Sequence, residues 1–257
     1  MFLEVVYKPT TLFSLKRSEA TNSAGKSLIS PSPYSIKMAL LNAIITYDSL
    51  AVGKKYFPLI RDLSISFSLP SEIVVNNCMI KIQKVKRNEF SSKEKKELSN
   101  KGLSKNDIKE MEDFKKISDP FQPVVAFREY VYLNEKIKLY IEIDDNIYEQ
   151  GKLRNNYEFL KKWFMHINYF GKKGCFFQFI SAKLILENQI HENYSSILTE
   201  NLQQGIIYQM DDMNNKMEFK NVNTYDSKNV KRTKKIYIFP YQQVSSNKNY
   251  TFLKQIE

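Results

Sequence analysis

The sequence predicts an α+β fold, in which an antiparallel sheet carries its helices on one face and leaves the other face free. Three observations support this class. Short stretches of alternating apolar and polar residues are typical of half-buried strands, longer stretches carry apolar residues at helical spacing, and the two kinds interleave along the chain. With 257 residues and a hydrophobic fraction of 42%, the chain can form one large domain or two small ones and can bury a core.

The first strand is predicted at residues 2–7, and a polar loop over residues 8–30 follows it. A connection of that length without structure of its own is unusual, so we expect the loop to be functional or to be partly ordered by a ligand. Strict alternation at residues 63–69 predicts a second strand, which Pro70 ends. Residues 73–85 predict a further strand or two short ones.

The first helix is predicted to begin at Ser32 and Pro33, because serine at the N-cap and proline at the first helical position are helix start signals. One apolar face follows at the spacing i, i+3, i+4, i+7 and i+8, made of Ile36, Ala39, Leu40, Ala43 and Ile44. Lys37 falls outside that face and is expected to be accessible.

Residues 86–119 differ in composition from the rest of the chain, because lysine and glutamate dominate and apolar residues are sparse. The apolar residues that remain predict one stripe of a short helix and are Leu103, Ile108, Met111 and Phe114. We therefore expect an insertion that projects from the domain.

The second half of the chain again alternates strands with a helix. Residues 124–143 predict a β-hairpin, and residues 156–168 predict the second helix. A glycine-containing loop at residues 170–174 then leads into a strand at residues 175–181. Beyond it the signals weaken, and only residues 235–239 predict another strand.

This order of elements is close to that of a βαββαβ domain, which is called ferredoxin-like or RRM-like, with enlarged loops. We expect the domain to span residues 1–183, with residues 86–123 as an inserted arm. Residues 184–257 are expected to form a less regular C-terminal extension that is partly β.

The net charge of +11 and the pI near 9.3 indicate an anionic partner, which is a nucleic acid, an anionic membrane or an acidic protein. The high aromatic fraction of 13% supplies rings that fill sheets and also stack on bases, which favours nucleic acid. No apolar run reaches the roughly 18 residues of a membrane span. Because the N-terminus also lacks the pattern of a signal peptide, we expect a cytoplasmic protein without a membrane partner.

The loop Phe170–Gly174 is the most informative candidate site, because glycines let backbone N–H groups approach a phosphate closely and two lysines lie between them. It is neither a Walker loop nor a dinucleotide-binding fingerprint, since it follows a helix and no Gly-Lys-Ser/Thr is present. The alternative is an ordinary connection between a helix and a strand. A second candidate anion site is residues 8–37, where lysines, Arg17 and hydroxyl groups precede the capped start of a helix.

Catalytic and metal-binding candidates are weaker. His166, shortly before the glycine loop, is a weak candidate for the acid or base of a metal-independent ribonuclease, and a packing role is the alternative. The isolated His191 is weaker still. The pairs Asp144-Asp145 and Asp211-Asp212 lie in turn-like sequence and show no third ligand for Mg²⁺.

The two cysteines, Cys78 and Cys175, lie in apolar strand-like stretches and are expected to be buried free thiols. Together with two histidines they show no zinc-binding spacing. We therefore predict no metal and no cofactor.

Three stretches together resemble the fifth family of CRISPR-associated Cas proteins, which belongs to the RAMP superfamily. After the first strand, SPSPYSIKMALL at residues 30–41 is similar to that family's entry into its first helix. DPF at 119–121 with AFREYVYL at 126–133 resembles the return from the inserted arm, and YFGKKGCFF at 169–177 resembles the RAMP glycine-rich loop. The resemblance covers residues 1 to about 181, and the loop carries fewer glycines than the family's pattern.

The resemblance implies a non-catalytic RNA-binding subunit of a type I Cascade effector that caps the 5′ handle of the CRISPR RNA (crRNA). Its partners would be the crRNA, the backbone subunit, the large subunit and, through the complex, target DNA. The alternatives are a metal-independent precursor-crRNA endoribonuclease and an unrelated RRM-like RNA-binding module. The candidate RNA-binding residues are Lys8, Lys16, Arg17, Lys26, Ser32, Lys37, Phe121, Arg128, Gly171, Lys172, Lys173 and Gly174.

Overall fold

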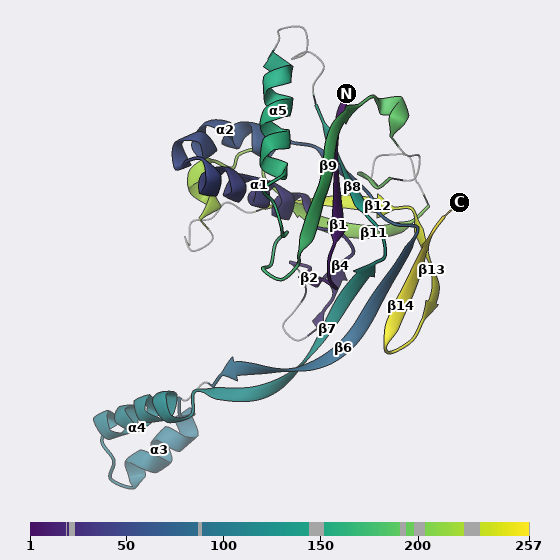
Figure 1. Cartoon of the computed structure of the whole chain (residues 1–257). Helices are drawn as coiled ribbons and strands as arrows, with labels where there is room; N and C mark the ends of the chain where they lie inside the picture. Colours follow the sequence, from purple (N-terminus) through teal and green to yellow (C-terminus); the bar gives the residue numbers. More distant parts are fainter. Residues whose placement is uncertain are drawn as a thin grey trace. The chain divides into compact units, whose positions relative to one another are not determined.

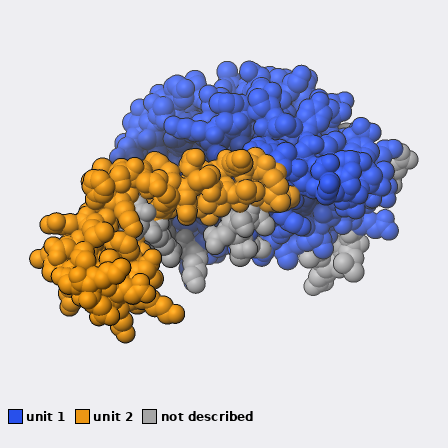
Figure 2. Space-filling model, turned by 90° about the horizontal axis from the view of Figure 1, so that it is seen from below, with its two compact units in different colours: residues 1–78, 128–257 blue, residues 79–127 orange. Residues whose placement is uncertain are grey.

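The computed structural model describes residues 1–18, 20, 24–86, 89–143, 152–190, 194–197, 204–223 and 232–256. The chain divides into two compact units, which Figure 2 shows in blue and orange. The larger unit joins Met1–Cys78 to Arg128–Glu257, and the smaller unit is Met79–Phe127.

The core of the larger unit is a four-stranded sheet with the order β5-β8-β1-β9, in which each pair of neighbours is antiparallel. Three helices lie on one side of this sheet (Figure 1). The strands are β1 (Phe2–Pro9), β5 (Ile65–Ser68), β8 (Ile137–Glu142) and β9 (Phe177–Ile185). The helices are α1 (Pro33–Tyr47), α2 (Leu50–Asp62) and α5 (Lys152–Phe164).

In chain order these elements read β1, α1 with α2, β5, β8, α5, β9, which is the βαββαβ order of a ferredoxin-like domain. The predicted fold class is therefore confirmed. Alternate residues of β1 are fully buried beneath the helices, as are Ile36, Leu40 and Ile44 of α1. Tyr7 donates a hydrogen bond of 2.6 Å to the carbonyl of Phe164 at the end of α5. Burial raises the pKa of Tyr7 well above its ordinary value.

The sequence prediction missed α2, which follows α1 after a short break. Its N-cap is Ser49, whose side chain accepts a hydrogen bond of 3.3 Å from the backbone N–H of Val52. Phe57 and Ile60 bury its inner face, and Pro58 lies within the helix. Proline is disfavoured in the interior of a helix, so Pro58 argued against predicting a helix over this stretch.

The smaller unit contains two helices and the adjoining parts of two long strands that pair with each other. The strands are β6 (Glu72–Val85) and β7 (Phe121–Leu133), and the helices are α3 (Ser92–Asn100) and α4 (Lys105–Ser118). Both helices begin with a capping box, formed by Ser91 with Glu94 and by Ser104 with Asp107. The prediction of one short helix here was wrong, because each serine starts a helix of its own.

The predicted hairpin at residues 124–143 was also wrong in its pairing. Strands occupy both halves of this stretch, but β7 and β8 fall in different sheets. Both edges of β8 are already taken by β1 and β5, so β7 cannot pair with it. Instead β7 joins the sheet β13-β14-β6-β7-β3.

The C-terminal residues lie in the same compact unit as the ferredoxin-like sheet and supply most of the remaining strands. The predicted strand at 235–239 is confirmed as part of β12, which lies in the sheet β10-β12-β11. The remaining elements are β2 (Leu15–Lys16), β3 (Ala24–Gly25), β4 (Ser27–Leu28), η2 (Glu187–Gln189), β10 (Ser196–Ile197), β11 (Ile206–Asp212), η3 (Phe219–Val222), β12 (Thr233–Phe239), β13 (Tyr241–Ser246) and β14 (Tyr250–Gln255).

Two buried tyrosines join this C-terminal part to the core. Tyr237 donates a hydrogen bond of 2.9 Å to the carbonyl of Ile65, and Tyr241 donates one of 2.7 Å to that of Pro70. Within the parts of the chain that the structure describes, no helix has the length and apolar character needed to cross a membrane.

Candidate functional site

A cavity of about 570 Å³ in the larger unit brings together residues that are far apart in the sequence. Its wall is formed by the segment around β2, the start of α1, the glycine loop, β11, Arg128 on β7, and Arg232 directly before β12. The lining includes half of the predicted RNA-binding residues, namely Lys16, Arg17, Ser32, Arg128, Gly171 and Lys172. It also includes Ser14, Leu15, Ser18, Leu28, Tyr34, Ser35, Met38, Gln209, Asp211 and Arg232.

The cavity is strongly cationic. Its charged lining residues are one carboxylate, that of Asp211, and five cations, those of Lys16, Arg17, Arg128, Lys172 and Arg232. A concave site lined mainly by one sign of charge attracts an oppositely charged ligand. The cavity is therefore suited to an anion larger than a single ion, and it also has apolar lining.

The start of α1 lines this cavity through Ser32, Tyr34 and Ser35. Ser32 caps the helix by accepting a hydrogen bond of 3.3 Å from the backbone N–H of Ser35, and the Ser35 hydroxyl donates one of 2.8 Å to the carbonyl of Ser32. The first turn contains no acidic residue. The positive end of the helix dipole therefore lies at the cavity with no acidic side chain in the first turn to offset it.

The glycine loop forms a tight turn whose two ends are buried and whose middle is exposed. Gly171 has φ +67° and Gly174 has φ +100°, values that favour glycine. The N–H of Lys172 donates a hydrogen bond of 2.9 Å to the carbonyl of Phe170, and the N–H of Cys175 donates one of 3.0 Å to that of Lys172. A side chain at Gly171 would come within 3.1 Å of Leu15, so glycine also allows the turn to pack closely beside β2.

The sequence analysis missed the wall contributed by the C-terminal strands. The guanidinium of Arg232 lies 3.9 Å from the ring centroid of Tyr34 on α1. Asp211 accepts hydrogen bonds of 2.9 Å from Arg232 and 2.8 Å from the hydroxyl of Ser18. The only available signal was the basic run at residues 231–235, whose first residue lies outside the described residues, and no pattern linked it to α1.

Tyr208 on β11 lies beside this wall. The guanidinium of Arg17 is 5.8 Å from the centroid of the Tyr208 ring. Burial, with a smaller contribution from the carboxylate of Glu129, raises the pKa of Tyr208 to about 12. Its phenol is therefore neutral at physiological pH and offers an aromatic surface to a cation.

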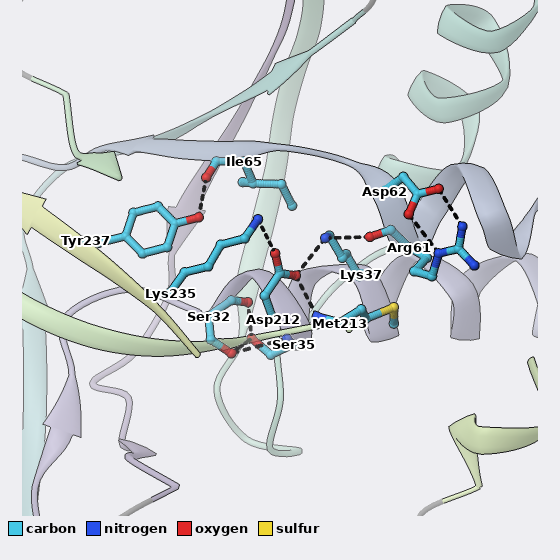
Figure 3. A network of polar contacts seen from close by, with 10 residues as sticks. All are labelled: Ser32, Ser35, Lys37, Arg61, Asp62, Ile65, Asp212, Met213, Lys235 and Tyr237. Atoms are coloured by element: carbon cyan, nitrogen blue, oxygen red, sulfur yellow. Dashed lines mark hydrogen bonds and ion pairs between the residues drawn. The ribbon is translucent and has the colours of Figure 1, made fainter. Parts of the chain in front are cut away.

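A buried ion cluster behind the cavity ties α1 to β11 and β12, as Figure 3 shows. Asp212 lies 2.6 Å from the ammonium of Lys37 and 2.8 Å from that of Lys235. Lys37 also donates a hydrogen bond of 2.8 Å to the carbonyl of Arg61 at the end of α2. Asp212 directly follows Asp211 of the cavity wall on β11, and Lys37 lies less than one helical turn after Tyr34 on α1. The ion pair between Asp212 and Lys37 therefore fixes the two sides of the cavity relative to each other.

The structure corrects the prediction for Lys37. Its side chain is only 1% exposed, so its ammonium serves the ion cluster and is not available to RNA. Burial lowers the pKa of Lys37, and the attraction of Asp212 opposes that effect. A lysine beside the apolar face of a helix is normally predicted to be exposed. The sequence did not indicate its burial, because its counter-ion, Asp212, lies 175 residues further along the chain.

The other predicted RNA-binding residues do not line the cavity. Lys8, Lys26, Lys173 and Gly174 are exposed in the larger unit. Phe121, which is 54% exposed, lies on β7 in the smaller unit.

The weaker candidates are placed as follows. The ring of His166 stacks on Tyr47 with centroids 4.5 Å apart, beside a small cavity of about 130 Å³. His191 and the pair Asp144-Asp145 lie outside the described residues, while Asp211 and Asp212 are both engaged in ion pairs. Among the described side chains no three metal-ligating groups gather, and Cys78 and Cys175 are free thiols.

Fold and cavity together define a ferredoxin-like α+β protein with a cationic cavity at the start of its first helix. The chain is 24% identical over 230 residues to CRISPR-associated protein Cas5 of Archaeoglobus fulgidus, and the match covers 85% of this chain and 82% of that protein. This match extends along most of the sequence and confirms the resemblance to the fifth family of CRISPR-associated proteins. No protein-family model matches the chain.

Solved structures were also compared. A CRISPR protein from Archaeoglobus fulgidus is 12% identical with a TM-score of 0.47, covering 100% of this chain and 92% of that one. A chain of a CRISPR RNA-guided surveillance complex is 9% identical with a TM-score of 0.41, covering 92% and 88%. A chain of a type III-B Cmr-β complex bound to target RNA is 14% identical with a TM-score of 0.35, covering 97% and 86%.

Proposed function

We propose that this chain is a non-catalytic RNA-binding subunit of a type I CRISPR effector complex, in which it caps the 5′ handle of the crRNA. The observation that carries the proposal is the cavity, which gathers Lys16, Arg17, Arg128, Lys172 and Arg232 around the start of α1. The likeness to Cas5 supports the assignment to a CRISPR complex. The choice of type I and of the 5′ handle rests on the family resemblance alone.

The cavity has the two kinds of group that single-stranded RNA requires. Lysine and arginine side chains with backbone N–H groups at a helix start neutralise phosphates. Aromatic rings and guanidinium planes, such as the stacked pair of Tyr34 and Arg232, accept unstacked bases. A folded-back RNA end, in which phosphates and bases point in different directions, would use both.

The proposed protein partners are the backbone subunit and the large subunit. Among the residues that the structure describes, seven of the 18 exposed large apolar side chains lie in the smaller unit, which has only 49 of the 257 residues, so exposed apolar side chains are over-represented there. Such enrichment is typical of surfaces that contact other proteins. The seven are Met79, Val85, Met111, Phe114, Ile117, Phe121 and Val125.

Handle recognition is tested by measuring the affinity of the purified chain for crRNA-handle RNA and for a scrambled RNA of the same composition at physiological salt. We expect the handle to bind about tenfold more tightly or better, because a few base contacts each contribute about 1–3 kcal/mol of discrimination. Equal affinities would contradict handle recognition and favour a general RRM-like module.

Replacing Lys172 and Lys173 together by alanine tests the contact with phosphates. We expect weaker binding and a salt dependence that is flatter by about 0.7 in log–log slope for each lysine that meets a phosphate. Replacing Lys54 and Lys55 on α2, which do not line the cavity, provides the matched control. An unchanged slope in the first variant would show that the glycine loop does not contact the RNA backbone.

The alternative of a metal-independent endoribonuclease is tested by incubating the chain with repeat-containing RNA in EDTA. We expect no specific cleavage, since the ring of His166 stacks on Tyr47 and lies tilted beside Trp163, with centroids 5.8 Å apart in the second pair. Specific cleavage that His166→Ala abolishes would overturn the non-catalytic assignment.

A further inference from the structure

A carboxylate in a cavity that binds phosphates needs a separate explanation. Asp211 is the only acidic residue in the lining, and its side chain is 11% exposed. A negative charge at this place repels phosphate, so it weakens the electrostatic attraction that the five cations provide. If the cavity only followed an RNA backbone, an uncharged residue would serve better.

The hydrogen bonds of Asp211 leave it with acceptor capacity. One oxygen, Oδ1, accepts from the hydroxyl of Ser18, and Oδ2 accepts from Arg232. Each carboxylate oxygen has two lone pairs, so each can accept one more hydrogen bond. The carboxylate is also held in place, because the next residue, Asp212, is anchored in the buried ion cluster.

The surroundings of Asp211 suit a base. Arg232 stacks on the ring of Tyr34 and forms a planar shelf beside the carboxylate. A base lying on the shelf formed by Arg232 and Tyr34 would turn an edge toward the carboxylate of Asp211.

We propose that Asp211 makes the cavity selective for guanine at one position of the bound RNA. Guanine presents two adjacent N–H donors, at N1 and at the N2 amino group, which match the two oxygens of one carboxylate. Adenine, cytosine and uracil do not present two adjacent donors on that edge. This inference rests on the proposed RNA-binding function and names the base that the same cavity selects.

The test uses fluorescence anisotropy with short oligouridine RNAs that carry a single guanosine, inosine, adenosine or cytidine. For the unmodified protein we expect the guanosine RNA to bind about 5- to 100-fold more tightly than all-uridine RNA, as for other bidentate base contacts. Inosine lacks the N2 amino group, so its RNA should bind between these two. Equal binding of the guanosine and inosine RNAs, or no preference for guanosine, would overturn the inference without any variant.

Asp211→Asn is expected to reduce the guanosine preference to within about twofold, while the affinity for all-uridine RNA stays the same or rises because a negative charge is lost. Asp48→Asn makes the same chemical change at an exposed position outside the cavity and should keep the preference. If Asp211→Asn instead changed binding of all the RNAs by one common factor, Asp211 would be only a counter-ion of Arg232 and the inference would fail.

Different results would contradict the RNA-binding function of the cavity and its selectivity for guanine. If RNA binding does not depend on Lys172 or Arg232, the cavity is not the RNA site and the proposed function fails. If binding depends on these cations but not on the identity of the base, the proposed function stands and only the guanine selectivity is wrong.

Discussion

The two walls of the cavity are built by different physical means. The wall made by α1 and the glycine loop depends on local backbone features, which are the N-cap at Ser32 and the positive φ of Gly171. The wall made by β11 and β12 depends on charges that meet across the fold, in the Arg232–Asp211 pair and the cluster around Asp212. Under the proposed function, the first wall would offer Lys172 and the start of α1 to phosphates, and the second wall would offer Asp211 to a base.

The comparison teaches that the first wall follows from local features of the sequence, while the second wall exists only after folding. Variants of the second wall are therefore expected to affect stability and base selection, and variants of the first wall to affect salt dependence and local geometry. Four predictions examine this contrast, in order of decreasing expected effect.

The largest effect is expected for Asp212→Ala, which leaves Lys37 and Lys235 buried or half-buried without their counter-ion. Removing one partner of a buried ion pair costs about 3–5 kcal/mol of the free energy of unfolding, as urea denaturation would measure. Asp62→Ala, which breaks the exposed pair with Arg61, should cost less than about 1 kcal/mol. Equal costs for the two variants would show that the ion cluster does not hold the second wall.

The next effect separates stacking from charge. Tyr34→Leu removes a ring on which Arg232 is stacked and should weaken RNA binding by about 1–3 kcal/mol with the salt dependence unchanged. Lys172→Ala should do the reverse and flatten the salt dependence. Titrations over a range of salt concentrations measure both quantities. A flatter slope in Tyr34→Leu would contradict the separate roles of stacking and charge in RNA binding.

A smaller effect concerns the backbone of the glycine loop. Gly171→Ala forces a side chain into the left-handed region and within 3.1 Å of Leu15, so it should destabilise the fold by about 1–2 kcal/mol. Gly174 also has a positive φ, of +100°, but an added side chain would meet no atom within 4 Å. Gly174→Ala therefore carries the conformational cost without the close contact. Thermal unfolding of both variants gives the comparison, and a greater loss for Gly174→Ala would show that packing against β2 is unimportant.

The smallest effect is expected for Ser32→Ala, which removes the N-cap of α1. A lost N-cap costs about 1 kcal/mol of stability, and the freed N–H of Ser35 remains at the cavity. Denaturation gives the cost, with Ser49→Ala at the N-cap of α2 as a control that should lose similar stability but no RNA affinity. A variant of Ser32 with full stability would show that the cap does not define the start of α1.

The sequence by itself determined the elements whose signals are local. The alternation of β1 and β5, the serine and proline that start α1, and the glycines of the loop each act within a few residues, so the ferredoxin-like order followed from them. The family resemblance depended on the same stretches. Six of the predicted RNA-binding residues line a single cavity, and no local pattern indicated the cavity itself.

Only the tertiary structure decided which charges meet. It buried Lys37 against Asp212, placed Arg232 on Tyr34, and assigned β7 and β8 to different sheets. Each of these outcomes depends on partners that are distant in the chain or on strand edges that are already occupied. Attraction between opposite charges and competition for sheet edges act through space, so a pattern of neighbouring residues does not reveal them.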